Sequence, residues 1–152
     1  MTRAQARLLP DGRRLHLHDG PIDLVISGDG EAGQVELAYD AARDRFATVL
    51  DELCAELPLL RQHVGEQPQG AVARRMWQAT IPFASQGFLT PMAAVAGSVA
   101  EEVLAAMCSA ATLSRAQQGV GGDQRLRRGA HGADRLRRPL RPLRSQRRRR
   151  AV

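Results

Sequence analysis

The amino-acid composition changes abruptly near Ser114, and this break limits how much of the chain can fold. Residues 1–114 contain 9 Arg and 14 Asp or Glu, a net charge of −5. Residues 115–152 contain 13 Arg and 2 Asp, a net charge of +11, with no aromatic residue and only two β-branched ones. Such a segment cannot build a packed core. We therefore predict a folded domain over residues 1–112 and a disordered basic tail over residues 113–152.

The first 30 residues predict an antiparallel β-meander. Pro10-Asp11-Gly12 is a turn sequence, because proline presets φ and glycine supplies a positive φ. Residues 14–18 alternate polar and apolar side chains, which places Leu15 and Leu17 on one face of a strand. A second turn at residues 19–21 leads into a third strand over residues 22–26.

Helical patterns follow the meander. Apolar residues spaced three or four apart predict an amphipathic helix over residues 34–57, ended by Pro58. We predict a shorter helix over residues 71–80 and a short strand over residues 87–89. An almost wholly apolar helix over residues 91–111 is expected inside the domain. The fold class is therefore α+β (α/β), a β-meander packed with helices.

The start of the last helix is the best candidate for a binding site. Thr90 is a favourable N-cap, and Pro91 at the first helical position loses no hydrogen bond. Small side chains over the next two turns let a flat ligand approach, and a free helix N-terminus favours phosphate. The alternative is that these small residues only pack tightly against the sheet. The candidate ligand-binding residues are Thr90, Pro91, Met92, Ala93, Ala94 and Gly97.

Other polar groups do not form a recognisable site. His16 and His18 share one face of a strand at a spacing that can hold a metal, but with no third ligand evident we interpret them as solvent-facing and predict no metal site. Glu101 and Glu102 point about 100° apart on a helix and cannot converge on one atom. We interpret both as part of a solvated face, with Glu102 as an alternative metal ligand.

Cys54 and Cys108 are interpreted as buried free thiols, and we identify no catalytic residue.

The sequence also bears on localisation. The N-terminus lacks the apolar stretch of a signal peptide, and no apolar run reaches the ~18 residues of a membrane span. We therefore expect a cytoplasmic protein without a membrane partner.

Four stretches of the chain resemble a known family. Residues 9–14, 20–26, 46–53 and 90–97 resemble uncharacterised protein family 0280, which is similar in fold to the ApbE-type flavin transferases. The resemblance covers roughly residues 6–108, and its most specific motif is TPMAAVAG at residues 90–97. It implies that this helix lines a flavin pocket, that FAD or FMN is the cofactor, and that the chain is a flavin transferase-like relative.

The resemblance also implies that the fold is incomplete. Family members continue with a strand and an Asn-Asn-Gly-Gly-Asp loop, of which only Gly121, Gly122 and Asp123 have counterparts here. The 22 basic residues are all Arg, which suggests a GC-rich coding sequence. We therefore hypothesise that the tail is read out of frame, and that the truncated chain binds a flavin or phosphate ligand without catalysing a reaction.

Two other functions remain open. The first is a small acidic domain with a basic arm for nucleic acid or acidic partners; lacking stacking aromatics, the arm would bind without sequence preference. The second is a homo-oligomeric interaction protein without a small ligand, which uses the helix over residues 91–111 as its dimer face.

Overall fold

Alternating side chains in the N-terminal strands determine which face of the sheet is buried. The computed structural model describes residues 4–120 and 123–128, and its first strands are β1 (Gln5–Leu8), β2 (Arg14–Asp19) and β3 (Ile22–Asp29). They pair antiparallel, with Leu8 opposite Leu15 and Asp19 opposite Ile22. Gly12 and Gly20 occupy the two turns with φ of 68° and 55°, a conformation that glycine adopts without strain. The predicted meander is confirmed.

The sheet continues into the segment predicted to be a tail. Strand β4 (Arg115–Val120) pairs antiparallel with β3, and β5 (Asp123–Arg128) pairs with β4, giving the order β1-β2-β3-β4-β5. Ala116 and Gln118 of β4 are buried.

The predicted boundary at residue 112 is therefore too early. A sheet that exposes one face needs few large apolar side chains, and its main-chain hydrogen bonds form whatever the composition. Composition alone consequently hides such a strand. The rest of the predicted tail, residues 129–152, lies outside the described residues.

The helices lie close to their predicted positions. They are α1 (Ala32–Ala55), α2 (Leu57–Leu60), α3 (Ala71–Thr80) and α4 (Val95–Ala110), with 3₁₀ turns η1 (Ile81–Gln86) and η2 (Pro91–Ala94). Two details differ from the prediction. Pro58 lies in the first turn of α2 instead of stopping α1, and residues 87–89 form no strand.

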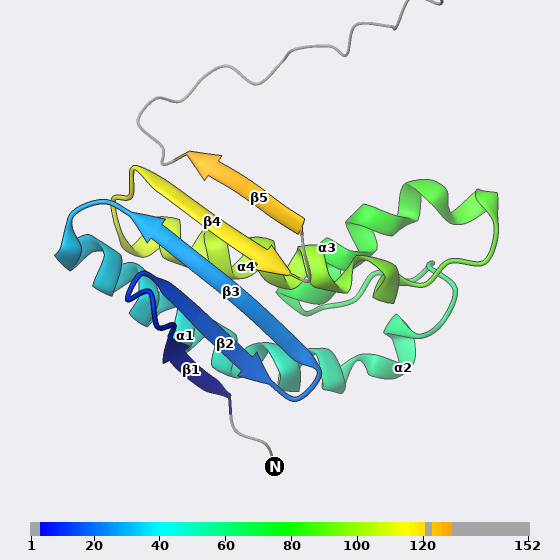
Figure 1. The fold of residues 1–152 in the computed structure, drawn as a ribbon. Coiled ribbons are helices and arrows are strands. Elements are labelled where there is room, and N and C mark those ends of the chain that lie inside the picture. The colour runs from blue at the N-terminus through cyan, green and yellow to red at the C-terminus, as the bar shows by residue number, and fades with distance from the viewer. Residues whose placement is uncertain (1–3, 121–122, 129–152) are drawn as a thin grey trace, which may run out of the picture.

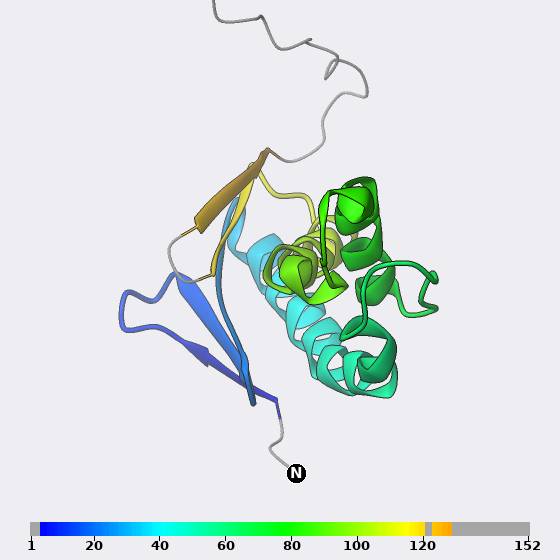
Figure 2. The ribbon, with the colours of Figure 1, turned by 90° about the vertical axis from the view of Figure 1, so that its right-hand side faces the viewer.

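All the helices cover one face of the sheet, and the other face is left open (Figures 1 and 2). Helix α4 packs against α1, α3 and β4, so it occupies the middle of the helical layer. The side chains between the layers are almost fully buried, and the largest are Phe46, Leu15, Leu17, Leu24, Ile26, Leu60, Met76, Leu104 and Met107.

Two sequence interpretations need correction. Cys54 and Cys108 are free as expected but exposed, because Leu53 and Met107 take the adjacent buried positions. The segment Pro91–Ala110 does have the length and the mean hydropathy, 1.4, that a membrane-crossing helix requires. Core helices meet the same two criteria, and here the segment packs against α1, α3 and β4.

The packing generates a direct stability prediction. Replacing Phe46, which is 1% exposed, with Ala removes the largest fully buried side chain and should cost about 3–5 kcal/mol of unfolding free energy. The matched control is Phe88→Ala, since Phe88 is 80% exposed and its loss should cost less than about 0.5 kcal/mol. Urea unfolding followed by circular dichroism measures both; equal losses would contradict the core assignment.

Candidate functional site

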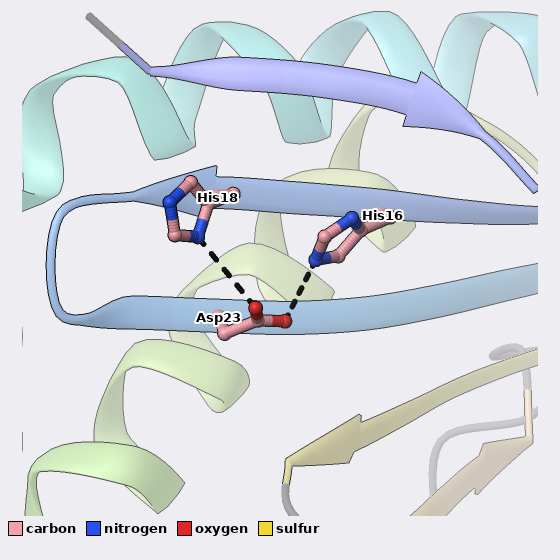
Figure 3. Close-up of side chains that lie close together, drawn as sticks. All are labelled: His16, His18 and Asp23. Atoms are coloured by element: carbon pink, nitrogen blue, oxygen red, sulfur yellow. Dashed lines mark hydrogen bonds and ion pairs between the residues drawn. The ribbon is translucent and has the colours of Figure 1, made fainter. Parts of the chain in front are cut away.

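The open face of the sheet brings together two histidines and an aspartate. On β2, His16 and His18 alternate with the buried Leu15 and Leu17 and therefore point away from the helices. Asp23 of β3 is the direct cross-strand partner of His18. Figure 3 shows both imidazole rings turned toward the Asp23 carboxylate.

The contacts within this cluster are short. The Nε2 atom of His16 lies 2.8 Å from Oδ1 of Asp23, and Nδ1 of His18 lies 3.6 Å from Oδ2. One ligand atom from each residue can be chosen so that all three lie within 4.8 Å of one another. The structure therefore places a third potential ligand beside His16 and His18, where none was evident from the sequence, and the absence of a metal site stays a prediction.

The cluster is partly shielded on its β1 side. Gln5 and Arg7 of β1 pair with His18 and His16, and together with Ala6 they line a shallow depression beside the two rings. The side chain of His16 is 26% exposed, that of His18 40% and that of Asp23 63%. Nδ1 of His18 is nevertheless buried and makes no hydrogen bond. The cluster therefore combines a sheltered nitrogen with a side open to solvent.

Asp23 was not predicted as a member of this cluster because it lies on a different strand from the histidines. The signal that could have found it is the predicted turn at residues 19–21. A tight turn there places residue 18 opposite residue 23, and neighbouring side chains on one face of paired strands lie close together. The hairpin register, taken with the two histidines, would have completed the cluster.

The predicted site at the start of the last helix contains both residues that pack against the core and residues that are exposed. Thr90 occupies the N-cap position of η2 in an extended conformation, but its side chain makes no cap hydrogen bond. Pro91 is buried, and Met92 and Ala94 pack against the core. Ala93 is exposed. A Cβ added at Gly97 would meet no atom within 4 Å, so packing does not require glycine there.

An exposed aromatic pair lies next to this helix start. The ring of Phe88 stacks on His63 with centroids 5.8 Å apart, and Phe88 is 80% exposed. The backbone N–H of Leu89 donates to Nδ1 of His63 at 3.2 Å, and that of Val64 donates to the Leu89 carbonyl at 2.8 Å. These bonds fix the loop that precedes Thr90 against the loop that follows α2.

Glu102 has a structural role that the sequence did not reveal. Arg45 of α1 donates from Nε to one carboxylate oxygen of Glu102 at 3.0 Å, and Arg75 of α3 donates to the other at 2.8 Å. Arg45 also makes a bidentate pair with Glu52, at 2.8 and 2.9 Å. Glu102 thus joins three helices, and the solvated-face interpretation is wrong for it because its side chain is only 15% exposed.

The charges of this cluster shift its acid–base equilibria. Desolvation raises the pKa of Glu102, but the hydrogen bonds from Arg45 and Arg75 outweigh it and hold that pKa below the usual 4.5. The hydrogen bond from Arg45 likewise lowers the pKa of Glu52. Both carboxylates therefore stabilise the fold in their ionised forms.

The fold and this site define a class of protein: a two-layer α+β domain with a five-stranded antiparallel sheet, open on one face, where a histidine–aspartate cluster lies. The chain belongs to the family described as AbpE bacteria, whose model matches residues 6–137. No curated protein and no solved structure matches the chain.

The family match corrects the resemblance drawn from the sequence. The chain is a member of the AbpE bacteria family, and its assignment to uncharacterised protein family 0280 and the ApbE-type flavin transferases is wrong. The match also continues to residue 137, past residue 108 where we expected the resemblance to end.

The charge cluster predicts a specific pH dependence. Glu102→Gln should lower the unfolding free energy by about 2 kcal/mol at pH 7, since it removes the carboxylate that bridges Arg45 and Arg75, although Arg45 keeps Glu52 and Arg75 keeps Glu101 as partners. Because the folded pKa of Glu102 lies below 4.5, its contribution is present above about pH 4.5 and disappears as the pH falls through the folded pKa. Denaturant unfolding should therefore show a larger difference between wild type and variant at pH 7 than at pH 3. Glu36→Gln, at an exposed position of α1, is the control.

Proposed function

We propose that this protein binds a divalent transition-metal ion, with zinc as the reference ion, through His16, His18 and Asp23. The observation that supports this is the convergence of two imidazole nitrogens and one carboxylate oxygen to within 4.8 Å of one another. Imidazole and carboxylate are common zinc ligands, with metal–ligand distances near 2.0–2.2 Å.

Two of the separations between ligand atoms are close to those around a tetrahedral ion. Bonds of that length at tetrahedral angles place two ligand atoms about 3.3 Å apart. The His16–Asp23 and His18–Asp23 separations, 2.8 and 3.6 Å, lie on either side of that value. These two separations run to different oxygens of the Asp23 carboxylate, and the three ligand atoms lie within 4.8 Å of one another. A metal would therefore require side-chain rotations that bring the ligand atoms closer together, with the strands held in place by their pairing.

The set of ligands leaves room for a further group. Three protein ligands occupy three positions of a tetrahedral ion, so water or an external anion would complete the coordination. Two histidines and one carboxylate with an open position is also a ligand set used for Fe²⁺. The proposal is for binding, and no reaction is assigned.

Metal titration tests the proposal. Isothermal calorimetry with Zn²⁺, and visible absorption with Co²⁺, should show a site in the wild-type protein that Asp23→Asn and His18→Ala weaken at least tenfold. Loss of a residue that only supports a metal ligand typically costs about 10–100-fold in affinity, so removing or neutralising a direct ligand should cost at least tenfold. Because protons compete for imidazole, the affinity should also fall as the pH is lowered.

The matched control for this titration is His63→Ala, which removes a histidine far along the chain from the cluster. It should leave the affinity within twofold of wild type. Equal Zn²⁺ affinity in wild type and Asp23→Asn would overturn the metal site.

A separate observation favours a second function. This function is the binding of a flavin or phosphate ligand, such as FAD or FMN, at the start of the last helix. The exposed ring of Phe88, supported by His63, offers a stacking surface two residues before Thr90. Ala93 and Gly97 leave open space on the following turns. The family match does not bear on this ligand. The basic-arm function rests largely on residues 129–152, which lie outside those described, and it stays a prediction, as do the oligomer and the cytoplasmic location.

Fluorescence titration distinguishes the flavin proposal. Quenching of FMN that is lost in Phe88→Ala and retained in Phe83→Ala would support it, because both phenylalanines are exposed but only Phe88 stacks on His63. Tighter binding of FMN than of riboflavin would assign a role to the phosphate. Absence of quenching by either flavin at 100 μM, about the weak end of cofactor affinities, rules the proposal out.

A further inference from the structure

We infer that a further site, in the cleft between the β1–β2 hairpin and helix α1, binds a primary ammonium group carried on an apolar body. This cleft lies on the helix-covered side of the sheet. The histidine cluster lies on the opposite face, so the two sites share no proposed ligand-binding side chain, although Gln5 and Ala6 of β1 line both depressions.

The cleft has the size and lining of a small-molecule site. Its volume is about 800 Å³, within the range of ligand pockets in proteins. Leu17 of β2 and Phe46, Ala47 and Leu50 of α1 supply its apolar wall. Leu50 also approaches the β2–β3 turn, because one of its methyl groups lies 3.4 Å from where a Cβ on Gly20 would be. The apolar wall therefore extends to the residue next to Asp19.

Asp19 gives this apolar cleft a negative group. It is the last residue of β2 and lines the cleft, although only 5% of the residue is exposed. Its Oδ1 atom is buried, and no donor in the described part of the chain hydrogen-bonds to it. Burying a carboxylate oxygen without a partner is costly, so a cationic donor that enters the cleft gains an unusually favourable partner.

The remaining charges of the cleft favour a cation over an anion. Asp44 and Asp51 line it with Asp19, and Arg43 is the cation among the lining residues. Arg43 is already engaged, since it donates to Asp40 at 2.6 Å. The cleft thus presents a net negative charge beside an apolar wall.

These features specify the chemistry of the ligand. A primary ammonium offers three donors in a compact group and can reach a nearly buried carboxylate, while an attached alkyl or aryl body lies against Ala47 and Leu50, whose side chains are not fully buried. Carboxylate- or phosphate-bearing ligands are disfavoured by the same acidic groups. An alkylammonium is the simplest molecule of this class.

Calorimetric titration with n-octylammonium, and with octanoate as a probe of equal length and opposite charge, tests the site in the full chain. Octylammonium should bind at least tenfold more tightly than octanoate. Asp19→Asn, which keeps the shape and removes the charge, should lower the octylammonium affinity at least tenfold. Glu66→Gln, on an exposed loop, should leave it within twofold.

The wild-type comparison does not depend on any variant folding correctly. Equal binding of octylammonium and octanoate, or no binding of either, overturns the proposal, as does full affinity in a folded Asp19→Asn protein. Because the two sites are on opposite faces, His18→Ala should leave octylammonium binding unchanged, and Asp19→Asn should leave Zn²⁺ binding unchanged. Failure of one site is therefore distinguishable from failure of the other.

Discussion

The packing of α1 and α4 against one face of the sheet is the constraint on which the rest of the molecule depends. Leu15, Leu17, Leu24 and Ile26 point into this layer and are at most 1% exposed. Because side chains alternate along a strand, burying these four fixes the direction of every residue between them. It turns His16, His18 and Asp23 outward and holds Asp19 on the inner side. The proposed metal site and the proposed ammonium site are both consequences of that one alternation.

Much of the fold can be predicted from local patterns. The turn at residues 10–12, the alternation around Leu15 and the spacing of apolar residues in α1 are all local signals, and each gave the correct element. Strand β4 was missed because its evidence is not local: it is held by pairing with β3, and only Ala116 and Gln118 of its described side chains are buried. A polar, Arg-rich sequence gives no sign of such a strand until its partner is known.

The sites were less predictable because they combine residues from different elements. The pairing of Asp23 with the histidines follows from a hairpin register, and the role of Glu102 follows from how α1, α3 and α4 pack. Neither the pairing of Asp23 nor the role of Glu102 can be predicted from the spacing of residues along one element. The small residues after Thr90 form a clear pattern along one element, but the pattern does not tell which of them pack and which are accessible. In the structure Pro91 and Met92 pack against the core, whereas Ala93 is exposed and Gly97 has free space beside it.

The connection between β3 and β4 also determines the order in which the protein can be completed during synthesis. The carbonyl of Asp29 accepts a hydrogen bond from the backbone of Ser114, 85 residues later. A ribosome adding 5–20 residues per second needs about 4–17 s to make that interval. Throughout it, the outer edge of β3 exposes unpaired peptide groups while the preceding strands are already available to fold. The nascent chain therefore passes through a stage in which its incomplete sheet can pair with that of a second nascent chain on the same messenger RNA.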